Sequence, residues 1–215
     1  MAPPTTNSKR VKGISISRPI LYGNVASPFS EKVEKPAGSP VDHTHLWTVF
    51  VRDPNGKDLS YFIKKVVFKL HDTYDSPTRS IESPPFEVTE TGWGEFEIGI
   101  KIYFVSESSE KNLSLFHHLK LHPFNREGEP PAVVESVLYE EVVFNEPTEK
   151  MFGILTSTPG SLLPFKNDAE HKFSKEMEMQ ELDRLKHALS EVMKQVNEQR
   201  DRLVELEKEK KELTS

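Results

Sequence analysis

Two short segments hold the residues best suited to chemistry. The segment 68–74 includes Thr73 and Tyr74, and the segment 90–96 includes Trp93 between two glycines. Each segment is typical of a strand that ends in a loop. Together they offer aromatic rings that can stack, a hydroxyl group and backbone amides that the glycines leave accessible. These groups predict a binding site for a small, flat amide.

The sequence lacks the motifs of enzyme chemistry. Histidine, aspartate, serine and threonine occur together around residues 71–83, but no G-x-S-x-G elbow, phosphate-binding loop or dinucleotide fingerprint is present. His117 and His118 are adjacent, so on a strand they point to opposite faces, and no cysteine or other ligand set accompanies them or His122. We therefore expect no enzyme, no catalytic residue, no cofactor and no metal.

Length and composition favour one domain with an appendage. The 215 residues are 35% apolar and 29% charged, which is enough apolar material for one sizeable core. Cysteine is absent, which excludes disulfides and thiolate chemistry and fits a reducing, intracellular compartment. We expect neither a signal peptide nor a membrane span. The net charge of −6 argues against direct DNA binding and favours a basic peptide partner.

Short apolar segments separated by Pro, Gly, Asn and Ser clusters predict an all-β fold. Residues 96–104 alternate apolar and other side chains, as in a sheet with one face on the core, whereas apolar residues fill nearly every position of 46–51, as in a strand buried on both faces. We expect about seven strands, which favours a β-sandwich. The first begins near Val11, residues 27–42 form a loop, and the others lie at 46–51, 66–70, 86–89, 96–105, 113–121 and 133–144.

The C-terminal part predicts a long helix. A short helix follows Pro147, residues 156–164 form a linker, and Asn167 is the expected N-cap of the long helix. Eight of ten heptad a and d positions are aliphatic, which predicts a coiled coil with another subunit or a second copy of the chain; a lone amphipathic helix that packs back on the domain is the alternative. The apolar seam consists of Leu182, Leu185, Leu189, Val192, Val196, Leu203, Leu206 and Leu213.

The two segments described first, together with His43 to Val51 and Leu119 to His122, strongly resemble the YEATS-domain family, whose members bind acylated lysine on histone tails. The resemblance extends from about Val11 to Pro159. It implies an immunoglobulin-like β-sandwich. We therefore expect a flexible basic arm at 1–10, a YEATS domain at 11–159, a linker at 160–166 and a C-terminal α-helical coiled coil at 167–215.

The resemblance also implies a role for each residue of the expected site. Tyr74 and Trp93 sandwich the acyl amide, the Thr73 hydroxyl bonds to it, and the backbone N–H of Trp93 points at the acyl oxygen. Gly92 and Gly94 flank that donor and let the backbone approach the ligand.

Three further residues complete the site that the resemblance implies. His43 and His71 line the same pocket, and Phe96 is the aromatic residue at its rear. Many family members have serine at the Thr73 position, and some have phenylalanine at the His43 position. Without the resemblance, Trp93 has an alternative interpretation as a core residue in a tight turn.

The implied function is recognition of acyl-lysine on a core-histone tail. Acetyl-lysine and crotonyl-lysine on histone H3 are the expected ligands. Pattern and length are similar to the small YEATS subunit shared by a histone-variant-exchange remodeller and a histone acetyltransferase complex, so the expected location is the nucleus and the expected partners are chromatin-complex subunits. The alternative is a histone chaperone or scaffold whose sandwich binds partners regardless of lysine acylation.

Overall fold

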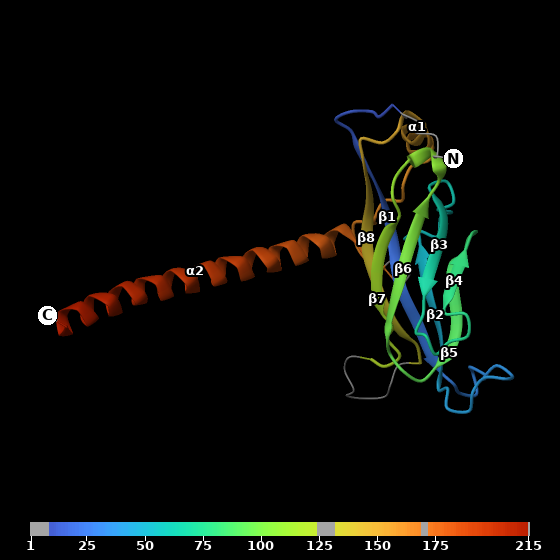
Figure 1. The fold of residues 1–215 in the computed structure, drawn as a ribbon, viewed down its shortest axis with the longest axis horizontal. Helices are drawn as coiled ribbons and strands as arrows, with labels where there is room; N and C mark the ends of the chain where they lie inside the picture. The colour runs from blue at the N-terminus through green and yellow to red at the C-terminus, as the bar shows by residue number, and fades with distance from the viewer. Residues whose placement is uncertain (1–8, 124–131, 169–171, 215) are drawn as a thin grey trace, which may run out of the picture. The chain divides into compact units, whose positions relative to one another are not determined.

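The fold contains two antiparallel four-stranded sheets that pack face to face (Figure 1). The computed structural model describes residues 9–123, 132–168 and 172–214. One sheet has the order β5-β2-β1-β8 and the other has the order β4-β3-β6-β7. The bounds in the first sheet are β5 Phe86–Gly92, β2 His45–Arg52, β1 Ser15–Pro28 and β8 Val134–Asn145. In the second they are β4 Thr78–Ile81, β3 Ile63–Lys69, β6 Glu97–Phe104 and β7 Leu113–His118. The predicted all-β sandwich is therefore confirmed.

The core lies between the sheets and follows the predicted alternation. Ile98, Ile100 and Ile102 of β6 are fully buried, because every second residue of the strand points inward. Strand β2 is buried on one face and only partly buried on the other, so the expected burial on both faces is met in part. Trp47 packs in the core, and Phe50 is buried outside the main cluster, where the Arg52 guanidinium lies 4.1 Å from its ring centroid.

A short helix, α1 (Glu149–Ser157), follows β8. Its N-cap is Thr148, whose hydroxyl accepts a hydrogen bond from the backbone N–H of Met151, so the predicted helix after Pro147 is confirmed. A 3₁₀ turn, η1 (Ser106–Ser108), lies between β6 and β7, and the backbone carbonyl of Glu107 accepts a hydrogen bond from Thr148.

The segment after α1 is tied to the sandwich. The buried guanidinium of Arg18 donates to the backbone carbonyls of Leu155 and Thr158. The hydroxyl of Ser161 donates to the buried carboxylate of Asp53 over 2.6 Å. The first compact unit accordingly extends to Leu162, slightly beyond the expected boundary at 159.

The N-terminal residues 1–8, most of the expected flexible arm, lie outside the described residues. Lys9 and Arg10 differ from that expectation because both are held in place. Lys9 forms an ion pair with Glu149, and Arg10 forms one with Glu110. The backbone N–H of Val11 also donates to the carbonyl of Pro147, and β1 begins four residues later than the predicted Val11 start.

The second unit contains the 39-residue helix α2 (Lys175–Leu213). The predicted start at Asn167 is wrong: residues 167 and 168 are not helical, and the N-cap is Ser174, whose hydroxyl accepts from the backbone N–H of Met177. All eight predicted seam residues are at least 50% exposed. Pairing of this seam into a coiled coil stays a prediction. No helix among the described residues is long and apolar enough to cross a membrane.

Candidate functional site

All eight residues predicted for the site line one open cleft of about 820 Å³. The cleft lies where three connections meet, those from β1 to β2, from β3 to β4 and from β5 to β6. Pairing explains the meeting, because β2 pairs with β5 and β3 pairs with β6. The eight are His43, His71, Thr73, Tyr74, Gly92, Trp93, Gly94 and Phe96.

Tyr74 forms a fixed wall of the cleft. Its ring centroid lies 5.6 Å from that of Phe96 and 5.8 Å from that of the buried Trp47. Its hydroxyl donates to the backbone carbonyl of Thr91 over 3.0 Å. Burial raises the pKa of the Tyr74 hydroxyl, which keeps it protonated as this donor. These contacts hold the ring before any ligand arrives.

Trp93 forms a more exposed wall. Its side chain is 63% exposed, which excludes the alternative of a core residue in a tight turn. The backbone N–H of Trp93 donates to none of the residues that the structure describes. Both the ring and this N–H are thus available to a ligand in the cleft.

Thr73 presents an acceptor to the cleft. The backbone N–H of Thr73 lies 3.3 Å from Nδ1 of His71, and the hydroxyl oxygen lies 3.0 Å from the same nitrogen. Because a backbone N–H can only donate, Nδ1 of His71 is the acceptor. The Thr73 hydroxyl therefore also donates to Nδ1, and its lone pairs remain free to accept a hydrogen bond from an amide N–H.

The two glycines beside Trp93 have different environments. A Cβ atom on Gly92 would lie 2.5 Å from the Tyr74 hydroxyl and 3.1 Å from Nε1 of Trp47, so this position has no room for a side chain. Gly92 also accepts a hydrogen bond from the backbone N–H of Thr44 through its carbonyl. At Gly94 a Cβ would meet no atom within 4 Å. The cleft is therefore tightly packed at Gly92 and open at Gly94.

Charged side chains surround the cleft. Glu90 forms an ion pair with Arg79 over 2.7 Å. Asp42 and Asp75 also line the cleft, and their exposed carboxylates have no hydrogen bond or ion pair with any described residue. The unpaired charge at the rim is thus negative.

His43 and Thr91 connect the start of β2 to the end of β5. Nδ1 of His43 lies 2.7 Å from the hydroxyl of Thr91, while the carbonyl of Thr91 holds Tyr74. Thr91 was not among the predicted site residues. Its only sequence signal is its place directly before the Gly-Trp-Gly motif.

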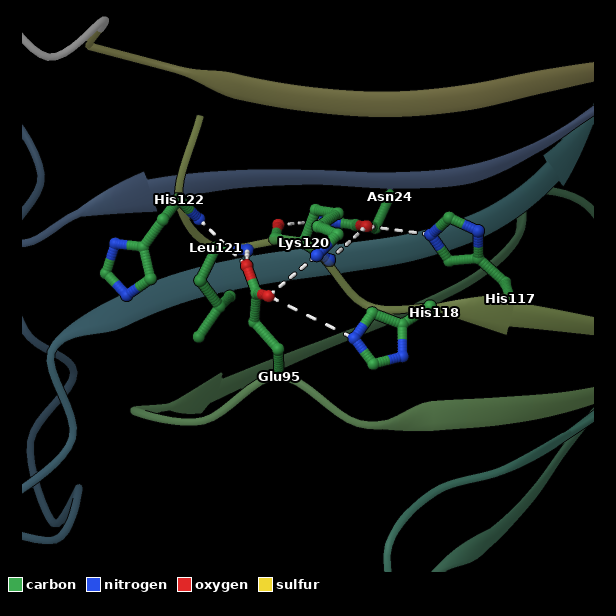
Figure 2. A network of polar contacts seen from close by, with 7 residues as sticks. All are labelled: Asn24, Glu95, His117, His118, Lys120, Leu121 and His122. Carbon is green, nitrogen blue, oxygen red and sulfur yellow. Dashed lines mark hydrogen bonds and ion pairs between the residues drawn. The ribbon is translucent and has the colours of Figure 1, made fainter. Parts of the chain in front are cut away.

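Glu95 was also missed, although it lies between two predicted site residues. Its carboxylate accepts hydrogen bonds from Nζ of Lys120 (2.9 Å) and from the backbone N–H groups of Leu121 (2.9 Å) and His122 (3.2 Å) (Figure 2). Partial burial raises the pKa of Glu95, but these hydrogen bonds outweigh burial and lower it to about 2. The group is therefore a carboxylate at any physiological pH.

The remaining histidines near the site are structural. His45 and His122 stack edge to face with centroids 5.0 Å apart, and burial followed by the charge of His122 lowers the pKa of His45. His117 is 3% exposed, its Nε2 lies 2.8 Å from Oδ1 of Asn24, and burial lowers its pKa to about 4. His118, its neighbour, is exposed on the opposite face, as predicted. No cluster of three potential metal ligands occurs within the described ranges.

Comparison with known proteins identifies the family. The sequence pattern of the YEATS family matches residues 42–123. The "Protein AF-9 homolog" of Saccharomyces cerevisiae is 49% identical over 224 aligned residues, which cover 97% of each chain. The chain belongs to the YEATS family. A second YEATS relative, the "Protein AF-9 homolog" of Candida glabrata, is 51% identical over 91% of this chain and 94% of its own.

Solved YEATS structures match the sandwich. The crystal structure of the yeast AF-9 homolog Yaf9 is 60% identical, with a TM-score of 0.64, and the match covers 70% of this chain and 99% of that chain. A Yaf9 YEATS domain bound to H3K27ac is 58% identical, with a TM-score of 0.63 and coverage of 70% and 99%. Another Yaf9 YEATS structure recognises an H3K122suc peptide, with 58% identity, a TM-score of 0.60 and coverage of 69% and 99%. The predicted family and fold are confirmed.

Proposed function

We propose that this YEATS domain is a reader of acyl-lysine on a histone tail, and not an enzyme. The observation that carries the proposal is a complementary hydrogen-bonding pair between two aromatic walls. Thr73 presents an acceptor, Trp93 presents a backbone donor, and both line the cleft beside the rings of Tyr74 and Trp93. An acylated lysine carries one amide N–H and one C=O, so it can satisfy both.

Acylation decides binding for a physical reason. A charged lysine that entered this cleft between aromatic walls would lose its hydration. Thr73 is the one acceptor proposed to replace the lost water contacts, so burial of the charge would cost free energy. Acylation removes the charge and supplies a flat group that stacks on the rings. The Yaf9 structures with H3K27ac and H3K122suc support the same ligand class for this chain.

The negative charge of Asp42 and Asp75 at the edge of the cleft favours a basic peptide as the carrier of that lysine. Histone tails are basic, and the unpaired carboxylates at the rim are those of Asp42 and Asp75. Charges at such a rim change the association rate and its salt dependence more than the final affinity. A tail of histone H3 is the proposed carrier.

The finer ligand preference includes crotonyl-lysine. The planar, conjugated chain of a crotonyl group can extend the stack on Tyr74 and Trp93. Gly94 leaves room on the open side of the cleft, because no atom lies within 4 Å of the position a Cβ would take there. We therefore expect crotonyl-lysine to bind at least as tightly as acetyl-lysine.

A calorimetric titration tests the proposal. Histone H3 tail peptides that differ only at one lysine, which is unmodified, acetylated or crotonylated, are titrated into the full chain. We expect micromolar affinity for the acylated peptides, since one side chain and its neighbours bury little area, and much weaker affinity for the unmodified peptide. Equal affinity for all three would reject the reader and favour the chaperone or scaffold.

The exposed seam of α2 supports assembly into a chromatin complex in the nucleus. Eight aliphatic residues, each at least half exposed, follow the heptad a and d positions, which is the pattern of a coiled-coil interface. Subunits of remodelling and histone acetyltransferase complexes are the proposed partners, and a homodimer is the other arrangement. Light scattering on the full chain, followed by isolation of the tagged protein with its nuclear partners, distinguishes the two.

A further inference from the structure

Glu95 lies in the chain segment that carries three other residues of the cleft. It follows Trp93 and Gly94 directly and precedes Phe96, so three residues of the cleft move with its backbone. The connection between β5 and β6 lies beyond the pairing of β6 with β7, whose last register pair joins Glu97 to His118. Beyond that pair, other contacts must hold the connection in place.

The carboxylate of Glu95 supplies those contacts. It accepts from Lys120, Leu121 and His122, as Figure 2 shows, and the carbonyl of Phe96 accepts from the backbone N–H of Leu119 over 2.8 Å. Four hydrogen bonds therefore attach two residues of the cleft to four consecutive residues that follow β7. Hydrogen bonds to an ionised carboxylate are stronger than those between neutral groups.

The attached segment is itself fixed to the centre of the other sheet. Asn24 of β1 is fully buried; its Nδ2 donates to the carbonyl of Lys120, and its Oδ1 accepts from the backbone N–H of Lys120 and lies 2.8 Å from Nε2 of His117 (Figure 2). Lys120 is thus held from both sides. A continuous set of polar contacts runs from the cleft through Glu95 to the middle of the sandwich.

From this geometry we propose that Glu95 is a positioning residue for acyl-lysine recognition: it fixes the loop that carries the Trp93 ring and its backbone N–H. The proposal rests on the proposed function. It explains how an exposed Trp93 can form a defined wall without packing in the core. The carboxylate oxygens of Glu95 are bonded to three donors of the fold, so the proposed role acts through the position of Trp93.

The test uses Glu95→Gln in the full chain, with Glu97→Gln as the matched control. Glutamine keeps the shape of Glu95 but replaces the oxygen that accepts from Lys120 with an NH₂ group, and it removes the charge from the oxygen that accepts from Leu121 and His122. Glu97 is exposed two residues away, and its carboxylate contacts no donor among the described residues. We expect Glu95→Gln to weaken binding of an acetylated histone H3 peptide about tenfold, with Glu97→Gln unchanged.

Hydrogen exchange separates positioning from general destabilisation. In Glu95→Gln, the amides of Leu121 and His122 should exchange faster because the oxygen that accepts from both of them loses its charge. The amide of Thr44, which donates to the carbonyl of Gly92 at the end of β5, should also exchange faster because the loop that follows Gly92 has loosened. The amides of Val49 and Ile100, in the centres of β2 and β6, should exchange as before.

Each outcome decides the matter. Unchanged affinity, or faster exchange of Val49 and Ile100 together with the rest, would overturn the positioning role. If Glu95→Gln does not fold, Lys120→Met removes one of the three donors and should give the same pattern at smaller amplitude. If the original chain does not distinguish acetylated from unmodified peptide, the proposed function fails, while the exchange of Thr44 still tests whether Glu95 holds the loop.

Discussion

Replacement of Tyr74 by alanine should lower stability far more than replacement of Trp93, although each residue forms a wall of the cleft. The half-buried Tyr74 ring packs against Trp47 and Phe96, and its hydroxyl donates to the carbonyl of Thr91. Fully buried aromatic residues lose about 3–5 kcal/mol on replacement by alanine, so half burial sets a cost of about 2 kcal/mol. The lost hydrogen bond adds about 1 kcal/mol. We therefore expect Tyr74→Ala to lower the free energy of unfolding by about 3 kcal/mol.

Trp93→Ala should leave stability nearly unchanged. With 63% of the side chain exposed, the expected change is about 0.5 kcal/mol or less. Binding of the acetylated peptide should nevertheless be lost in both variants, because each removes one wall. Phe116→Ala is the matched control for Trp93, since Phe116 is 64% exposed on β7 and lies outside the cleft.

Urea unfolding and calorimetric titration on the same samples measure both effects. Tyr74→Phe adds a test of the hydroxyl: it should lose about 1 kcal/mol of stability and keep the stacking wall. A large loss of stability in Trp93→Ala would show that its ring is packed in solution, against the exposed geometry. Full binding by Trp93→Ala, with a normal unfolding curve, would refute its assignment as a wall.

Four further changes test other parts of the structure. Thr73→Val should weaken acyl-peptide binding by about 1–3 kcal/mol in calorimetry, because it leaves the ligand N–H unpaired, whereas Thr73→Ser should bind normally. Gly92→Ala should reduce both binding and thermal stability, because its Cβ would lie 2.5 Å from the Tyr74 hydroxyl; Gly94→Ala should do neither. The pKa of His117 is about 4 in the fold and ordinarily 6.5, so the unfolded chain binds more protons between these values. The free energy of unfolding should therefore fall by about 3 kcal/mol as the pH drops from 6.5 to 4. Urea unfolding should show a smaller fall in His117→Gln. Leu189→Arg should disrupt assembly in light scattering without changing single-peptide affinity, and Ser190→Arg, off the seam, should leave both unchanged.

The strands that the sequence predicted are those with strong local signals. Alternation marked β6, which is buried on one face, and a nearly continuous apolar run marked β2, which is buried on one face and partly buried on the other. Strand β4 was missed. It has four residues, none of them buried, so neither period nor apolar content distinguishes Thr78–Ile81 from a loop.

The start of the long helix was predicted seven residues too early. Asn167 and Ser174 are both good N-cap residues, and propensity alone does not choose between them. The structure chooses Ser174, which is buried. The first N–H groups of the helix, those of Lys175 and Glu176, donate to the carbonyls of Pro164 and Phe165. Because the chain folds back on itself here, a window of local sequence does not contain the deciding contacts.

The cleft shows the same division between local and long-range information. Residue types and the flanking glycines pointed to the segments 68–74 and 90–96, and the resemblance to the YEATS family nominated eight residues. The sandwich brings all eight to one cleft because β2 pairs with β5 and β3 pairs with β6. The hydrogen bonds that fix the geometry of these residues could not be predicted from the sequence. The acceptor of Tyr74 is a backbone carbonyl, and the donors to Glu95 lie 25–27 residues further along the chain. Three of these four partner groups are backbone groups, which are the same in every residue, so no residue type reports them. A YEATS chain could therefore keep every ring of the cleft and still bind weakly after a single change at Glu95, which makes the loop anchor a separate requirement from the aromatic walls.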